Sequence, residues 1–112
     1  MEKINKYKTI LQTEMEYRAA IKSSNIPSLK RRLIVNATQS EFIIIKMGWH
    51  KKEFRHYTVF HIEIKTNGQV WIYENNTDVN MIERLEQQGI LRSDITLGFL
   101  TPIEDNVTEL VA

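Results

Sequence analysis

Apolar residues recur at two different periods along this chain. Over about residues 3–22 they recur roughly every 3.6 residues, which predicts an amphipathic helix whose charged residues form a solvated face. From Arg32 the period changes to two, and four segments rich in β-branched and aromatic residues predict strands. These segments are residues 33–35, 42–49, 54–65 and 69–74. The short turns between them predict an antiparallel meander.

The pair Asn67-Gly68 predicts how the last two strands of the meander are joined. Asn-Gly is preferred in two-residue type I′ turns, because both central positions of that turn need a positive φ. A two-residue turn places Ile64 opposite Trp71. The two side chains should then lie on the same face of the sheet, because directly opposed residues point to the same side.

The loop before the third strand predicts the rest of the register. With residues 50–53 as a four-residue loop, Trp49 lies opposite Phe54. The same register places Ile43 opposite Phe60. Both turns together predict a core face of nine residues: Ile43, Ile45, Met47, Thr58, Phe60, Ile62, Ile64, Trp71 and Tyr73. The opposite face is also rich in apolar residues, so we expect the helix, the C-terminal segment or another protein to cover part of it.

Two further elements complete the predicted fold. A second helix over about residues 78–88 ends at Gly89, which suits a left-handed C-cap. A short closing strand follows at residues 95–100. We therefore predict a single domain over residues 1–112 of the α+β class, with an N-terminal helix, an antiparallel β-meander of about four strands, a second helix and a short closing strand.

The composition excludes several classes of protein and site. The chain has no cysteine, which excludes disulfides, Cys-based zinc sites and thiol catalysis and fits a reducing compartment. It has no apolar run of about 18 residues and no signal-peptide core, so we expect a cytoplasmic protein that does not enter a membrane. We also expect no metal and no cofactor, because the three histidines lack zinc-site spacing and no phosphate-binding glycine loop is present.

The net charge of +1 hides an asymmetry along the chain. Residues 1–56 carry twelve Lys and Arg against five Glu, whereas residues 57–112 carry three against nine acidic residues. Two basic clusters are candidates for phosphate contacts in nucleic acid: Lys30, Arg31, Arg32 and Lys51, Lys52, Arg55. Trp49 and Phe54 would suit base stacking if they are exposed. The alternative is that these cations are ordinary solvated loop charges.

Glu63 and Lys65 form the E-x-K pair that metal-dependent nucleases place on a strand. In such sites the carboxylate holds a divalent ion and the lysine helps to position the attacking water. A second carboxylate is also needed, and only Glu41 and Glu53 are available upstream. A solvated strand face explains the same pair without chemistry, so we predict no catalytic residue here.

His61 is predicted to lie opposite Glu74 on the neighbouring strand. An imidazole beside a carboxylate is used in general base catalysis, but it is also an ordinary cross-strand pair that stabilises a sheet. No nucleophile lies at a recognisable spacing from these two residues. We therefore interpret them as a structural pair.

Short motifs keep a characteristic order and spacing over residues 42–102. They are Gly48-Trp49, His61-Ile62-Glu63-Ile64, Asn67-Gly68-Gln69-Val70-Trp71-Ile72, Thr77-Asp78, Gly89-Ile90, Asp94-Ile95-Thr96-Leu97-Gly98-Phe99 and Pro102. Together they resemble the XisI family of fdxN element excision controlling factors. Tyr7, Ile10-Leu11 and Tyr17 also fit the opening helix of that family, so the resemblance covers nearly the whole chain.

The resemblance implies a cyanobacterial-type protein associated with the excision of a DNA element by a separate recombinase. It also implies an XisH-like partner with a nuclease-like fold, so the chain itself is expected to be a non-enzymatic accessory protein. We expect the partner to bind at a sheet edge or on the apolar sheet face around Phe42, Ile44, Val59 and Ile72. Direct DNA binding through the basic clusters and self-association remain open alternatives.

Overall fold

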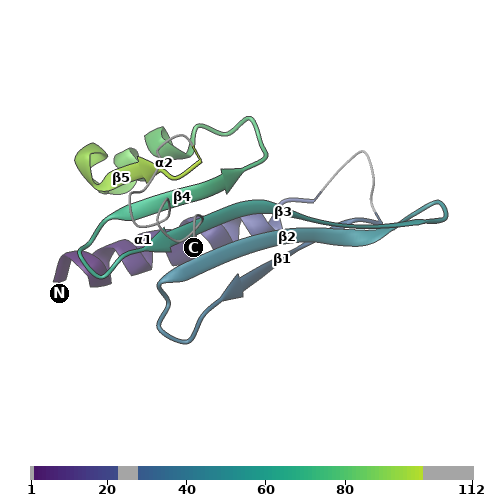
Figure 1. The fold of residues 1–112 in the computed structure, drawn as a ribbon, viewed down its shortest axis with the longest axis horizontal. Coiled ribbons are helices and arrows are strands. Elements are labelled where there is room, and N and C mark those ends of the chain that lie inside the picture. Colours follow the sequence, from purple (N-terminus) through teal and green to yellow (C-terminus); the bar gives the residue numbers. More distant parts are fainter. Residues whose placement is uncertain (1, 23–27, 100–112) are drawn as a thin grey trace, which may run out of the picture.

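Two helices cover one face of a five-stranded sheet in the computed structural model, which describes residues 2–22 and 28–99 (Figure 1). The elements are α1 (Glu2–Ala20), β1 (Lys30–Val35), β2 (Glu41–His50), β3 (Glu53–Ile64), β4 (Val70–Asn75), α2 (Met81–Gln88), the 3-10 helix η1 (Arg92–Asp94) and β5 (Ile95–Leu97). The strand order is β1-β2-β3-β4-β5, with β5 parallel to β4 and every other pair antiparallel. This architecture confirms the predicted α+β fold, in which a four-stranded meander lies between the two helices in the sequence.

One side of α1 packs against the sheet. Tyr7, Leu11 and Met15 are spaced by four residues, so they lie on the same side of the helix, where they are buried in the core. Glu14 and Arg18 are buried as well, so the prediction of a solvated face is wrong for these two charged residues. Within the described part of the chain, no helix combines the length and the apolar character needed to cross a membrane.

The loop between β3 and β4 has three residues rather than two. The N–H of Gly68 donates to the carbonyl of Lys65 over 2.9 Å, and Gly68 has a left-handed φ of 87°. This is a type I turn followed by a left-handed glycine, so the predicted type I′ turn is wrong. Ile64 therefore pairs with Val70 instead of Trp71. The shift of one residue moves Trp71 to the sheet face that points away from the helices.

Two β-bulges also change which side chains face the core. A register shift next to Ile44 places that residue, rather than Ile43, opposite Phe60. A second shift occurs after His61, where β3 pairs with β4. An extra residue in one strand bends that strand and reverses the alternation of its side chains beyond the bulge. The predicted core face is consequently correct only in part.

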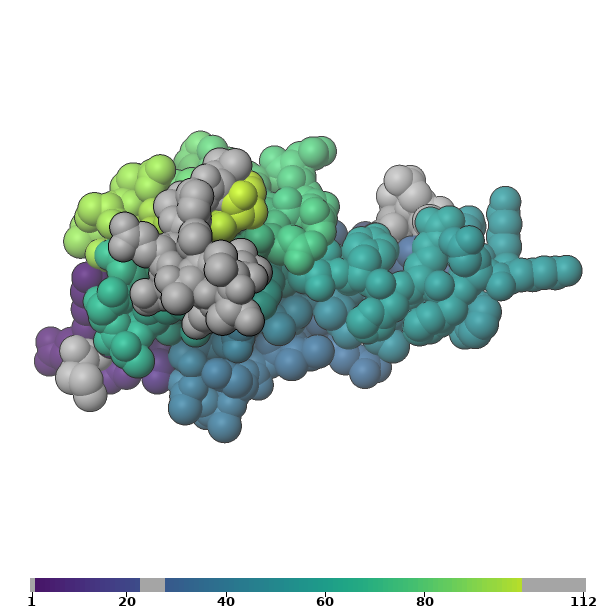
Figure 2. All heavy atoms as spheres, viewed as in Figure 1, coloured from purple at the N-terminus to yellow at the C-terminus, as the bar shows by residue number. Residues whose placement is uncertain are grey.

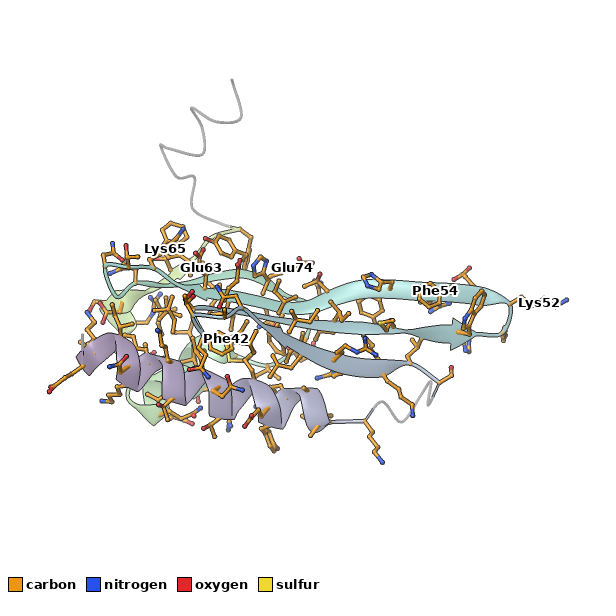
Figure 3. All side chains as sticks on the ribbon, turned by 90° about the horizontal axis from the view of Figure 1, so that it is seen from below. Phe42, Lys52, Phe54, Glu63, Lys65 and Glu74 are labelled. Carbon is orange, nitrogen blue, oxygen red and sulfur yellow. The ribbon has the colours of Figure 1, made fainter. Side chains whose placement is uncertain are left out.

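The apolar face that carries the predicted partner site is the core of the protein. Phe42, Ile44, Val59 and Ile72 are at most 2% exposed. They pack in one cluster with buried residues of α1 and α2, and Figure 3 shows α1 running beneath the strand that carries Phe42. The bulges and the three-residue loop turn these side chains toward the helices, which supply the cover that this face requires. The prediction that these four residues bind a partner is therefore wrong.

Candidate functional site

The two basic clusters of the sequence lie at the same end of the sheet. Strand pairing places Arg31 opposite Lys46, so the cations of β1 lie beside the base of the β2–β3 hairpin. The β1 pairing ends at Met47, and beyond it the hairpin projects from the body of the molecule as a narrow ribbon (Figures 1 and 2). We call residues 46–57 the arm. Cations that are distant in the sequence thus form one basic surface.

The arm carries much more positive than negative charge. Residues 46–57 contain four Lys and Arg and one acidic residue, Glu53. The Glu53 carboxylate accepts a hydrogen bond from Arg55 over 3.1 Å, and because both side chains are exposed, water weakens this pair. Lys52 extends from the tip of the arm away from the body (Figure 3). The arm is therefore a positively charged projection with one weakly held counter-charge.

A two-residue turn closes the arm, where the sequence predicted a four-residue loop. His50 pairs with Glu53, so only Lys51 and Lys52 remain in the turn. Lys51 has a left-handed φ of 59°, a conformation that costs a residue other than glycine roughly 1–2 kcal/mol. Asn or Gly would be favoured in such a turn. The shorter turn holds two exposed lysines next to each other at the tip of the arm.

The predicted nucleic-acid contacts on β1 are not equally available. Arg31 points toward α1, where its guanidinium donates to the backbone carbonyl of Arg18 over 3.0 Å. Lys30 and Arg32 alternate with it along the strand and are exposed on the other face. Neither of them forms an ion pair with any residue in 2–22 or 28–99. With respect to the residues that the structure describes, Lys30 and Arg32 are therefore the cations of this cluster that are free to meet an anion.

An exposed aromatic pair lies on the face of the arm that points away from the helices. Trp49 lies opposite Phe54, which confirms the predicted register, and their ring centroids are 5.4 Å apart. The His56 ring stacks on Phe54 at 6.4 Å. Trp49 is 61% exposed and Phe54 is 47% exposed. Lys30 shares this face, because Met47 lies between it and His56 in the register.

Glu63 and Lys65 lie on the sheet face opposite to α1, where they contact each other and Tyr73 (Figure 3). The Lys65 ammonium lies 3.3 Å from the Glu63 carboxylate, and the Tyr73 hydroxyl donates to the same carboxylate over 2.7 Å. The hydrogen bond to Tyr73 is the main reason why the pKa of Lys65 is raised above its usual value. Lys65 thus stays charged, and its contacts are those of a stable surface network.

His61 contacts a carboxylate other than the predicted one. In the backbone register it lies opposite Glu74, as predicted. Its Nε2 atom, however, lies 2.8 Å from the carboxylate of Glu41 on β2. Glu41 is one of the two upstream carboxylates considered for a nuclease site, and this contact occupies it. Within the described residues, no group of three His, Asp or Glu side chains is arranged to hold a metal ion.

A buried carboxylate, which was predicted to lie in solvent, joins the two helices. Glu14 of α1 accepts hydrogen bonds from Arg18 over 2.7 Å and from Arg84 and Gln88 of α2 over 2.9 Å each. Burial raises the pKa of the Glu14 carboxyl, but these hydrogen bonds outweigh burial and hold that pKa below its usual value. The signal in the sequence is its spacing, because Glu14 lies three residues after Leu11 and seven after Tyr7, on the apolar side of α1. Glu14 positions α2 and is not exposed to a ligand.

Asp94 forms a second polar anchor, next to the start of β5. The Tyr7 hydroxyl donates to its carboxylate over 2.6 Å, and the Lys3 ammonium lies 2.9 Å from the same oxygen. The hydrogen bond from Tyr7 is the main cause of a lowered Asp94 pKa. This contact ties the closing strand to α1, so the polar groups buried in the body serve the fold.

Two solved structures share this architecture over most of their length. A XisI-like protein from Anabaena variabilis matches with a TM-score of 0.77 and 26% identity, covering 88% of this chain and 89% of that chain. The fdxN element excision controlling factor XisI from the same organism matches with a TM-score of 0.75 and 25% identity, covering 89% of this chain and 95% of that chain.

The comparison with curated proteins found no match. The family model described as XisI protein matches residues 1–111. Because this match spans nearly the whole sequence and the fold agrees with both Anabaena structures, the chain belongs to the XisI family.

Proposed function

We propose that this protein is a non-enzymatic accessory factor in the excision of a DNA element and that it acts in complex with an XisH-like, nuclease-fold partner. The observation that carries the proposal is the match to the XisI family together with the structural similarity to an excision controlling factor. The side-chain contacts support a binding role. The E-x-K pair and the imidazole of His61 are both engaged in contacts within the sheet.

We place the partner contact on the open edge of β1. This strand pairs only with β2 in the described sheet, so its other edge is available for strand addition. Residues 30–32 carry charges, which usually protect an edge, but residues 33–35 are Leu-Ile-Val and carry none. Ile34 is 45% exposed. The uncharged half of the edge therefore replaces the buried apolar face as the candidate partner surface.

Co-expression with an XisH-like protein tests this proposal. We expect a stable mixed complex in size-exclusion chromatography with light scattering, and we expect Ile34→Lys to weaken it at least about tenfold, because an edge lysine disfavours strand addition. Leu91→Lys is the matched control, since Leu91 is also an exposed apolar residue but lies outside the sheet. A wild-type protein that forms no mixed complex would remove the proposal, and an equally strong Ile34→Lys complex would move the contact away from β1.

Direct DNA binding is a second candidate function, and one observation favours it. The structure joins both basic clusters on one end of the sheet, with Lys30 and Arg32 on β1 and the two lysines at the tip of the arm. Each phosphate that a cation neutralises releases a condensed counterion, so binding through this surface should weaken steeply with salt. The acidic residues of the second half of the chain lie outside the arm.

Charge reversal at the arm tip tests direct DNA binding. In the double variant Lys51→Glu and Lys52→Glu, we expect the slope of log Kd against log salt to fall by about 2, because two phosphate contacts are lost. Fluorescence anisotropy with labelled DNA between low and moderate salt measures this slope. The double variant Lys6→Glu and Lys8→Glu, on α1, is the control for net charge. Unchanged affinity in the arm variant would contradict a role of the arm in DNA binding.

A further inference from the structure

We propose that the arm binds single-stranded DNA by stacking bases on Trp49 and Phe54 while the surrounding cations hold the phosphates. This inference rests on the proposed direct DNA binding and specifies the form of the ligand. A single strand presents both base faces and phosphates to a protein, and proteins that bind it combine exposed aromatic rings with a positively charged track. The arm has both features in one place.

The exposure of the aromatic pair distinguishes it from the two phenylalanines of the sheet core. Phe42 and Phe60 are completely buried beneath the helices. Trp49 and Phe54 lie beyond the region that α1 covers, and about half or more of each side chain is exposed. Their contact across the hairpin, with ring planes inclined by 58°, stabilises the arm but uses only part of each ring. The remaining ring surface is available for a base.

The cations lie on both sides of the aromatic pair along the arm. The tip lysines, Lys51 and Lys52, lie at the distal end, separated from Trp49 by His50. At the proximal end, Lys30 lies opposite Met47, two residues before Trp49 and on the same face. A strand that stacks on the aromatic pair would therefore meet a cation in either direction along its backbone. This order of a ring platform between cations matches the contacts that one nucleic-acid strand requires.

A duplex and an acidic protein are weaker fits to the same surface. A two-stranded ribbon has the width to enter a major groove, but the base faces of a duplex are hidden in its stack, so the exposed rings would have no base to contact. An acidic protein surface would satisfy the lysines but would give no reason for two neighbouring aromatic side chains among them. The combination of rings and cations therefore favours a single strand.

Oligonucleotide binding to the full-length protein tests the inference. Fluorescence anisotropy with labelled oligodeoxythymidine of about 12 nucleotides should show salt-dependent binding that is tighter than binding of a duplex of the same length. We expect Trp49→Ala and Phe54→Ala each to weaken the single-strand complex about 5- to 150-fold. Tyr17→Ala is the matched control, because Tyr17 is an exposed aromatic residue on α1, away from the arm.

Two further measurements separate stacking from a damaged arm. Trp49→Leu and Phe54→Leu keep an apolar contact across the hairpin but have no ring, so they should lose affinity in the same way while the thermal unfolding curve stays unchanged. In a Trp71→Phe variant, Trp49 is the one remaining tryptophan. Its fluorescence should be quenched when unlabelled oligodeoxythymidine stacks on it.

The outcomes distinguish this inference from the function on which it rests. Binding that is lost on charge reversal at the tip but is unchanged in the ring variants would overturn stacking and leave direct DNA binding intact. A duplex bound more tightly than the single strand would overturn the inference in the same way. A wild-type protein that binds neither DNA at low salt would overturn both the inference and direct DNA binding.

Discussion

Replacing Phe42 by alanine is expected to lower the free energy of unfolding by about 3–5 kcal/mol, because the change removes a large buried side chain and leaves a cavity beneath α1. Phe42 is fully buried and packs in the cluster formed by the sheet and both helices. A domain of this size is stable by only about 5–15 kcal/mol, so the loss is a large share of the total. Urea unfolding followed by circular dichroism measures it.

Phe54→Ala is the matched control for this prediction, because it makes the same change on the exposed arm. Phe54 is about half exposed and lies outside the core cluster, so we expect Phe54→Ala to change the free energy of unfolding by less than about 1 kcal/mol. A small effect of Phe42→Ala, similar to that of the control, would contradict the burial of this sheet face. It would also restore the original prediction that the face is a partner surface.

Replacing Glu14 by alanine is expected to lower the free energy of unfolding by about 3 kcal/mol. The change leaves the buried Arg18 without its carboxylate and removes the contacts that hold Arg84 and Gln88 of α2. Breaking a buried ion pair by removing one partner typically costs about 3–5 kcal/mol. The lower end of that range applies here, because the Arg84 side chain is partly exposed and water can solvate it. Thermal and urea unfolding measure the change.

Glu16→Ala, two residues further along α1, is the control for Glu14→Ala, because Glu16 is exposed. The pH dependence gives a second readout. The folded-state pKa of Glu14 lies below its usual value of 4.5, so its contribution is fully present above that value and is lost as the pH falls through the folded-state pKa. Wild type should therefore lose more stability on acidification than Glu14→Ala. Equal acid sensitivity of the two proteins would contradict this role of Glu14.

The body of the molecule and the arm differ in what stabilises them. The body is held by the buried faces of α1 and α2 on the sheet and by the polar anchors at Glu14 and Asp94. The arm contributes little to that core, so its side chains are free to be selected for binding. Variants in the arm should accordingly separate binding from stability, whereas variants beneath the helices should change both.

Much of the fold could be predicted from periodicity and turn residues. The change of period near Arg32 located the start of the meander, and Gly89 located the end of α2, where that glycine is left-handed. The start of α2 at Met81 is three residues later than predicted. The pairing of Trp49 with Phe54 was also predicted correctly. These features depend on residues close to each other in the sequence, where local propensity and turn chemistry act directly.

Which face of the sheet is buried could not be predicted, because the central strands carry apolar residues on both faces. The pattern is equally compatible with Ile43 or Ile44 in the core, and one bulge or one extra loop residue exchanges them. Packing against α1 decides between the two. The buried position of Glu14 has the same origin, since its partners on α2 are distant in the sequence.

The sequence by itself determined the elements, their order and the residue types available for binding, because these follow from local periodicity, turn residues and composition. Tertiary structure decided which face of the sheet is buried, that Phe42 and its neighbours belong to the core, and that two distant basic clusters adjoin one exposed aromatic pair. These properties depend on strand register and helix packing. Both arise from contacts between residues far apart in the chain, which no local pattern encodes.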